Sequence, residues 1–319
     1  KEVFFRQTLQ YISANFVSQG LSMANSILLR RFLGPSSMGL WNIIQVILGY
    51  CGYASFGTTK AMARDYPYFK GKGDLEMAAR LKDMTVTFTM TASVLPAAIL
   101  AGYLVFRGEM LDPLLRNGLC FLIGFLFVQR FYDLVVVLLR SDKQFEVVSA
   151  LIVINAVGSL LISLFLVSRF NISGLYLGTA LLLFVSLAFS HCAHPYPFRL
   201  YWNRAELWRE LRLGMPLVVH SFLFELLRGL DRLLIGKYLG FYDAGLYSIA
   251  IMVSQYVYSL PMMFAHVWYP NLQEDYGSRG SAEAVKNYLV KPVWIFAVLI
   301  PFLCALGIYG TPVLVHLFL

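Results

Sequence analysis

One pattern of residues occurs twice in this chain, and the repetition restricts the possible folds more than any other feature. The stretch from Leu33 to Trp41 reads LGPSSMGLW, and the stretch from Leu239 to Tyr247 reads LGFYDAGLY, 206 positions later. Each copy separates two long apolar runs. Because similarity at a fixed offset indicates repeated structural units, the sequence predicts an internally duplicated protein.

The composition predicts that both repeats lie in a membrane. Hydrophobic residues make up 58% of the chain and charged residues only 14%, whereas about a quarter of the residues in soluble domains are charged. Runs of about 20 apolar residues, the length that crosses hydrocarbon as a helix, recur along the whole sequence. The alternation typical of a membrane β-barrel is not seen. We therefore expect an all-α polytopic membrane protein, and no nucleic-acid partner despite the net charge of +8.

The apolar runs and the loops between them predict a topology. We expect nine spans, at residues 7–31, 36–58, 84–106, 117–139, 147–168, 173–193, 214–238, 242–267 and 291–318. When residues at the very end of a span are counted with the adjacent side, 17 of the 26 Lys and Arg residues lie on the side of the N-terminus, six on the opposite side and three within spans. Because basic residues favour the cytosolic side, the N-terminus is predicted to be cytosolic.

The repeat also predicts the domain organisation. Pro96 and Gly102 in the third span correspond to Pro301 and Gly307 in the ninth. One repeat then contains about six helices, and both copies cross the membrane in the same direction, related by an axis along the membrane normal. We expect a six-helix lobe over residues 1–200 and the first three helices of a second lobe over residues 201–319, with about three further helices completing that lobe in the natural protein.

Three predicted spans carry polar side chains on one face. In span 7–31, the polar residues fall within an arc of about 120°; they are Asn15, Ser18, Gln19, Ser22, Asn25 and Ser26. In span 214–238 they fall within about 140°; they are His220, Glu225, Arg228, Asp231 and Arg232. Span 117–139 adds Gln129, Arg130 and Asp133.

Ionisable groups at membrane depth are costly unless they are paired or hydrated, so these faces favour a watered interior cavity. The alternative is that paired ions and amides only hold helices together. The sequence contains no Ser-His-Asp order, phosphate-binding glycine loop or HExxH stretch, so we expect no enzymatic activity. The four cysteines form no CxxC pair and His220 has no histidine partner at i,i+4, so we expect no metal site.

The chain resembles the polysaccharide-biosynthesis or O-antigen flippases (Wzx type) of the multidrug/oligosaccharidyl-lipid/polysaccharide exporter superfamily. The resemblance rests on RRFLGPSSMGLW, on the basic linker after the second span, and on DRLLIGKYLGFYDAGLYSIA from Asp231 to Ala250. It implies a two-lobe, MATE-like helical bundle around a central cavity, with alternating access. It also implies a bacterial or archaeal plasma (inner) membrane, and movement of a polyprenyl-diphosphate-linked oligosaccharide from the cytosolic to the outer leaflet.

Under this resemblance the polar residues receive expected roles. The expected substrate-binding residues are Arg130, Arg228, Arg232, Gln19 and Asn25. The expected ion-coupling residues are Glu225, Asp133 and Asp231, which would exchange H⁺ or Na⁺; no other cofactor is expected. The expected partners are the lipid-linked glycan, membrane lipids and glycan-assembly proteins.

Two other functions stay open at this point. A multidrug or metabolite cation antiporter of the same superfamily would share the fold, and a non-transporting scaffold of a glycan-synthesis complex would share the membrane topology. A glycan polymerase or ligase fits less well, because the longest predicted outer loop covers only residues 107–116.

Overall fold

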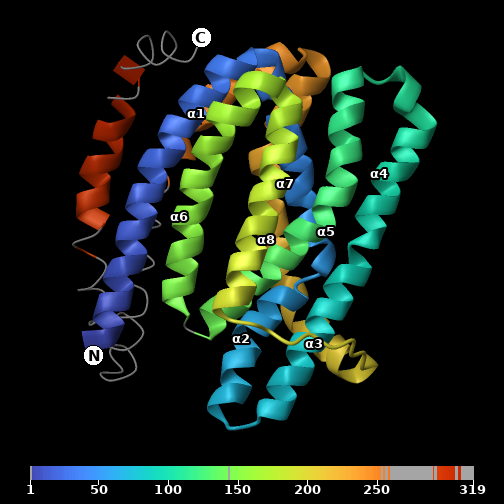
Figure 1. Cartoon of the computed structure of the whole chain (residues 1–319), viewed down its shortest axis with the longest axis vertical. Helices are drawn as coiled ribbons and strands as arrows, with labels where there is room; N and C mark the ends of the chain where they lie inside the picture. Colours follow the sequence, from blue (N-terminus) through green and yellow to red (C-terminus); the bar gives the residue numbers. More distant parts are fainter. Residues whose placement is uncertain are drawn as a thin grey trace. The chain divides into compact units, whose positions relative to one another are not determined.

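A computed structural model describes residues 2–142, 144–252, 254, 255, 258, 290, 293–305, 308 and 309. These residues are almost entirely helical, and no strand occurs among them. The α-helices up to residue 238 are α1 (Glu2–Cys51), α2 (Thr58–Gly71), α3 (Leu75–Ala92), α4 (Val94–Arg107), α5 (Pro113–Ser141), α6 (Phe145–Ile162), α7 (Ser168–Ala193) and α8 (Arg204–Tyr238) (Figure 1). Short 3₁₀ turns cover Gly52–Ser55 and Gly108–Met110, and a π-helical turn covers Ser163–Val167. Residues 241–252 are also helical.

Contacts divide the chain into two compact units, Lys1–Gly245 and Leu246–Leu319. Helix α8, the first predicted helix of the second lobe, therefore packs within the same unit as the predicted first lobe. The predicted boundary between the lobes near residue 200 stays a prediction. Parts of the predicted spans 242–267 and 291–318, the loop between them except Val290, and Gly307 lie outside the described residues.

Four helical segments in the described part of the chain are long and apolar enough to cross a membrane: Leu75–Met110, Pro113–Ser141, Phe145–Ala193 and Arg204–Tyr238. The third segment contains two predicted spans, because the backbone turns at Asn171, with φ 51° and ψ −133°. Helix α1 likewise contains two predicted spans separated by Gly34, with φ 70° and ψ 172°. Helix α1 is not one of the four apolar segments, because its polar residues lower its mean hydropathy.

The duplication is also visible in the backbone. Gly34 has a φ of +70°, and Gly240, at the matching position of the second copy, has a φ of +98°. Positive φ values are easily adopted only by glycine. The two copies of the pattern therefore share a positive φ at the same glycine as well as a sequence.

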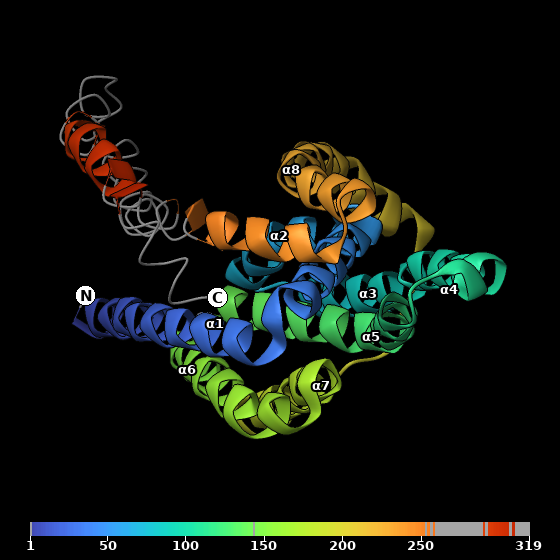
Figure 2. The same cartoon turned by 90° about the horizontal axis from the view of Figure 1, so that it is seen from above.

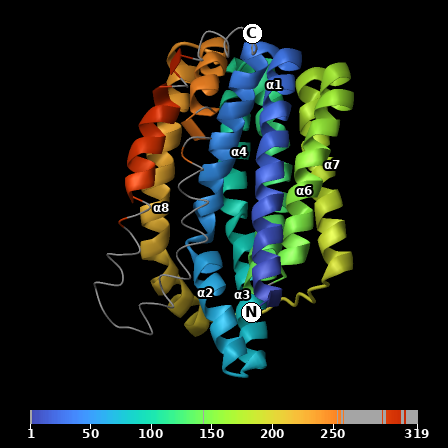
Figure 3. The ribbon, with the colours of Figure 1, turned by 90° about the vertical axis from the view of Figure 1, so that its left-hand side faces the viewer.

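The ends of the helices alternate between two sides, as the predicted topology requires. The start of α1, the turn between α2 and α3, and the start of α8 lie at one end of the first unit, which we call the α2 end (Figures 1 and 3). The kink of α1 at Gly34 and the turn between α4 and α5 lie at the other end, which we call the Gly34 end. Seen along the helices, α8 lies on one side of the bundle, with α6 and α7 on the other (Figure 2).

Large apolar side chains cover much of the outside of this bundle. Phe106 is 86% exposed and Leu227 is 75% exposed. Water would not tolerate so extensive an apolar surface, so lipid is its solvent. Inside, one buried cluster joins α1, α4, α5, α6 and α7, and a second joins α2, α3, α5, α6 and α8 near the α2 end.

Two charged segments at the α2 end form the starts of α3 and α8. Asp74 caps α3, because its carboxylate accepts a hydrogen bond from the Met77 N–H at 3.0 Å. The charged stretch 204–212 forms the first turns of α8. These turns pack against α2, and the Glu210 side chain is fully buried.

Candidate functional site

A cavity of about 380 Å³ with a mixed polar and apolar lining lies between α1, α5, α6 and α7. This volume is in the range of pockets that hold small molecules. Its polar lining consists of Gln45, Gln129, Arg130, Tyr132, Asn155 and Thr179, and its apolar lining includes Leu48, Phe125, Leu182 and Leu183. The cavity thus combines hydrogen-bonding groups with one permanent cation, Arg130.

Arg130 is held by its neighbours on α5. Its Nη1 lies 3.3 Å from Oδ2 of Asp133, and Gln129 Nε2 donates a hydrogen bond of 2.9 Å to the other carboxylate oxygen. The i,i+3 pairing expected from the sequence is therefore present. The Arg130 side chain remains 16% exposed, so one part of it faces the cavity while another faces Asp133.

Asn155, on α6, links this helix to α5 and α7 at the cavity. Its amide nitrogen donates to the Tyr132 hydroxyl at 2.9 Å and to the Leu151 carbonyl at 2.8 Å, while Ser186 donates to its amide oxygen at 3.2 Å. Neither Asn155 nor the cavity residues Gln45 and Thr179 were among the predicted site residues. Asn155 has Ser159 at i+4 and Ser163 at i+8, and Gln45 has Asn42 at i−3. These helical spacings are the signal that could have found the two residues, whereas Thr179 has no Asn, Gln, Ser or Thr at i±3 or i±4.

Arg130 of α5 and Glu225 of α8 both lie close to the glycines at residues 49 and 52. A Cβ on Gly52 would lie 2.9 Å from Cζ of Arg130, and a Cβ on Gly49 would lie 3.7 Å from Oε1 of Glu225. Gly49 also lines the cavity. Arg130 and Glu225, which belong to different predicted lobes, therefore approach one helical turn at residues 49–52.

Helix α8 packs lengthwise against the second half of α1. The Tyr50 hydroxyl donates to the Leu226 carbonyl at 3.3 Å, and the Tyr53 hydroxyl donates to the Ser221 carbonyl at 3.1 Å. A Cβ on Gly229 would lie only 2.6 Å from the Tyr50 hydroxyl oxygen. We call this contact the α1–α8 seam.

The predicted charges on α8 differ in their exposure at this seam. Glu225, Asp231 and Arg232 are half-buried, whereas Arg228 is exposed. The Asp231 carboxylate accepts a hydrogen bond of 2.7 Å from the Arg232 backbone N–H. The four charges therefore lie on one helix, as predicted, but in different surroundings.

The polar face of the first span has a different neighbour. The Ser163 hydroxyl, in the π-helical turn after α6, donates a hydrogen bond to the Asn25 amide oxygen. This contact is the kind that joins helices within a membrane. Gln19 is half-buried, and the Asn15 side chain lies outside the described residues. Asn25 of the first span therefore contacts the turn after α6, whereas the residues of α8 contact the second predicted span, residues 36–58.

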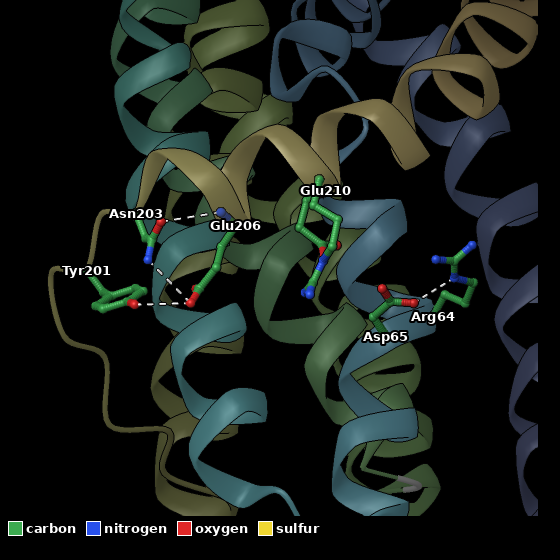
Figure 4. Close-up of polar contacts among 7 residues, drawn as sticks. Arg64, Asp65, Tyr201, Asn203, Glu206 and Glu210 are labelled. Carbon is green, nitrogen blue, oxygen red and sulfur yellow. Dashed lines mark hydrogen bonds and ion pairs between the residues drawn. The ribbon is translucent and has the colours of Figure 1, made fainter.

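A second polar group lies where α8 begins, beside α2 (Figure 4). Asn203 caps α8 by accepting hydrogen bonds from the N–H groups of Ala205 and Glu206. Arg209 donates two bonds to Oε1 of the buried Glu210, at 3.1 and 3.3 Å. On α2, Arg64 Nε lies 2.6 Å from Oδ1 of Asp65. Each of these bonds lies within α8 and its cap or within α2, and the two helices pack against each other at this point.

Two solved structures share this fold. An inward-facing conformation of a multidrug resistance MATE family transporter of the MOP superfamily matches with a TM-score of 0.70 and 14% identity, over 98% of this chain and 75% of that chain. An outward-facing conformation of such a transporter matches with a TM-score of 0.64 and 16% identity, over 98% of this chain and 73% of that chain. No curated protein matches the sequence significantly.

The family is shown by the sequence itself. A model of the family described as polysaccharide biosynthesis protein matches residues 28–318, which is most of the chain. The predicted all-α, polytopic membrane class and the predicted resemblance are both confirmed. The chain is a multi-pass membrane protein with the MATE fold, and it belongs to the polysaccharide biosynthesis protein family.

Proposed function

We propose that this protein is a flippase that moves a polyprenyl-diphosphate-linked oligosaccharide from the cytosolic to the outer leaflet by alternating access. The observation that carries the proposal is the cavity at membrane depth in which Arg130 lies beside hydrogen-bonding amides. Membership of the polysaccharide biosynthesis family supports a glycan substrate, and the MATE fold supports a two-lobe carrier rather than an enzyme.

The cavity chemistry suits an anionic glycan. A guanidinium group stays charged at all physiological pH values and donates paired hydrogen bonds to a phosphate or a carboxylate. The side-chain amides of Gln45 and Gln129 both donate and accept, as sugar hydroxyls require. Arg228 and Arg232 on α8, with Gln19 and Asn25 on α1, would extend this path beyond the cavity.

Glu225 is the first candidate for ion coupling. It is half-buried and faces Gly49, next to the turn that Arg130 approaches. A carboxylate in this position can take up H⁺ or Na⁺ and thereby change the charge that Arg130 experiences. Asp133 already accepts from Gln129 and pairs with Arg130, so it and Asp231 are second candidates.

The proposed setting follows from the substrate. A lipid-linked glycan is completed on the cytosolic face, so the protein would lie in the plasma (inner) membrane with a cytosolic N-terminus. Membrane lipids and glycan-assembly proteins are the proposed partners. The carrier would need the complete second lobe to enclose its substrate.

The second candidate function is a cation antiporter, since both solved structures that share the fold are multidrug transporters. Asp133 pairs with Arg130 and offsets its charge, so charge alone does not decide between the two functions. Membership of the polysaccharide biosynthesis family favours the flippase. A scaffold would move neither class of substrate.

The test uses the full-length protein in vesicles that contain a fluorescent polyprenyl-diphosphate-linked glycan. We expect the wild type to move the glycan between leaflets, Arg130→Lys to retain part of this rate, and Arg130→Ala to lose about tenfold or more, the effect of one charge-assisted hydrogen bond. Gly52→Ala should also slow transport, because its Cβ displaces the guanidinium.

Gly124→Ala is the matched control for Gly52→Ala, since Gly124 lies on α5 and a Cβ there would meet no atom within 4 Å. Efflux of a cationic dye is measured in the same vesicles. Dye efflux without glycan movement would assign the antiporter, and movement of neither substrate would assign the scaffold. A wild-type rate for Arg130→Ala would remove Arg130 from the substrate path.

A further inference from the structure

The two copies of the repeated pattern contact each other in space, and the contact is reciprocal. A Cβ on Gly39 would lie 2.8 Å from the backbone nitrogen of Gly245 and closer still to the carbonyl oxygen of Phe241. A Cβ on Gly245 would lie 2.9 Å from Cα of Pro35, and closer to its carbonyl oxygen. Each copy thus offers one glycine to one carbonyl of the other.

The positions in this contact correspond through the duplication. Pro35 and Phe241 are third in their copies, and Gly39 and Gly245 are seventh. Backbone approaches this close leave no room for any side chain, so both positions require glycine. Gly39 and Gly245, which occupy the same position in the repeated pattern, are therefore the residues at which the two copies contact each other.

The reciprocity locates the contact. When residue i of one unit touches j of the other and j touches i, the contact surrounds the two-fold axis that relates the units. The predicted repeats are related by an axis along the membrane normal. The glycine contact therefore lies on this axis at the Gly34 end, which is the outer side in the predicted topology.

The next step rests on the proposed function, in which the substrate passes between two lobes. If an axis relates the two lobes, the substrate path between them runs along this axis. A contact between the lobes on the axis therefore closes the path at that end of the protein. We propose that the two copies of the pattern form the outer gate of the carrier, with Gly39 and Gly245 as its closing residues.

The α2 end supplies a comparison. There Gly57 and Gly214 approach equally closely, since a Cβ on Gly57 would lie 2.8 Å from Cα of Gly214. Lys60 Nζ donates to the Ser221 hydroxyl and, at 3.4 Å, to the Leu217 carbonyl in the same region. Gly57 and Gly214 are not equivalent positions of the repeat, so this close approach is not a contact between the two copies of the pattern. A substitution here is as severe sterically but should leave the outer gate closed.

The gate is tested by a distance measurement that needs no transport. In the full-length protein, with native cysteines replaced by serine, nitroxide labels are placed at Phe170 and Tyr242, which are 62% and 54% exposed. Electron–electron double resonance then reports the separation near the Gly34 end. We expect Gly39→Ala and Gly245→Ala each to decrease the short-distance population by about tenfold or more, because the added methyl group overpacks the contact.

Two controls should keep the wild-type distribution at this end: Gly214→Ala, and Gly102→Ala, whose Cβ would meet no atom within 4 Å. A wild-type distribution in both gate variants would overturn the proposal. If both variants fail to fold, the labelled wild type decides: saturating lipid-linked glycan should populate a longer distance, and an invariant distance would overturn the gate. A gate that opens in a protein that moves no glycan would overturn the flippase assignment alone.

Discussion

At the scale of single residues, one buried carboxylate holds together several segments that lie outside the four apolar helical segments. Asp142, at the end of α5, has a side chain that is only 3% exposed. Its carboxylate accepts hydrogen bonds from the Tyr196 hydroxyl at 2.8 Å and the Tyr66 hydroxyl at 3.4 Å, and it pairs with Lys70 at 2.5 Å. One carboxylate therefore ties α2 and the segment before α8 to the end of α5.

This cluster predicts a loss of stability at alkaline pH. Burial, together with the nearby Asp142 carboxylate, raises the pKa of Tyr66 from its ordinary value of 10.0 to about 12. The pKa of Tyr196 is raised by burial and by the same carboxylate. The unfolded chain then releases these protons first as the pH rises, so their contribution to stability is complete below about pH 10 and is lost as the pH rises toward about 12.

The measurement is thermal unfolding across this pH range, with tyrosinate absorbance as the titration signal. Asp142→Asn removes the negative charge, so the tyrosines should titrate closer to their ordinary pKa, and the alkaline loss should shrink. At neutral pH the same variant should be less stable by about 1–3 kcal/mol, because buried partners lose their acceptor. Glu109→Gln, in an exposed turn, is the control. Unchanged tyrosine titration in Asp142→Asn would contradict this account.

At the scale of elements, one glycine divides α1 into two spans. Gly34 has φ 70° and ψ 172°, a region that is essentially restricted to glycine. We predict that Gly34→Ala destabilises the protein by about 1–3 kcal/mol through backbone strain. Gly20→Ala, inside the helical first half of α1 with no atom within 4 Å of its Cβ, should instead stabilise by up to about 1 kcal/mol.

Both variants have the same change of side chain, so helix propensity alone would shift their stabilities in the same direction. Thermal unfolding in detergent separates the two effects. A gain of stability in Gly34→Ala would show that the protein can adopt another backbone conformation at this turn.

The start of α8 shows how packing can bury a charged residue in a segment whose sequence is typical of a surface helix. Residues 204–212 alternate in sign as a surface helix does, yet they continue into the membrane span. Glu210 is buried because α2 packs against these turns, while the Arg209 side chain remains 43% exposed and supplies two hydrogen bonds. Local charge spacing predicts the helix but not the neighbour that covers it.

At the scale of the whole molecule, the proposed coupling predicts a response to an ion gradient. A gradient of one pH unit supplies about 1.4 kcal/mol per proton, enough to accumulate a coupled substrate about tenfold. In vesicles, the full-length wild type should show this accumulation with either a proton or a sodium gradient, whichever ion is coupled. Glu225→Gln should still equilibrate the glycan but should not accumulate it.

Glu146→Gln, in the first turn of α6, is the control for Glu225→Gln, since it removes a carboxylate away from the seam. Full accumulation by Glu225→Gln would assign the coupling ion to another carboxylate, with Asp133 and Asp231 as the next to be replaced. No gradient response in the wild type would show that transport is uncoupled.

The sequence alone was sufficient for the features that depend on neighbours along the chain. The apolar runs predicted the membrane helices, the two copies of one pattern predicted the duplication, and the i,i+3 spacing predicted the pair between Arg130 and Asp133. These features follow from helix periodicity, which depends only on the order of residues. The Asp74 cap is local in the same sense.

Contacts between distant segments required the folded chain. Gln45, Asn155 and Thr179 line one cavity although they come from three helices. Gly49 and Gly52 bring Glu225 and Arg130 to one turn, and Gly39 meets Gly245 across the repeat. Periodicity shows which residues share a face of a helix, but the helix that covers this face is selected by close packing among all the helices together, and no local pattern encodes that selection.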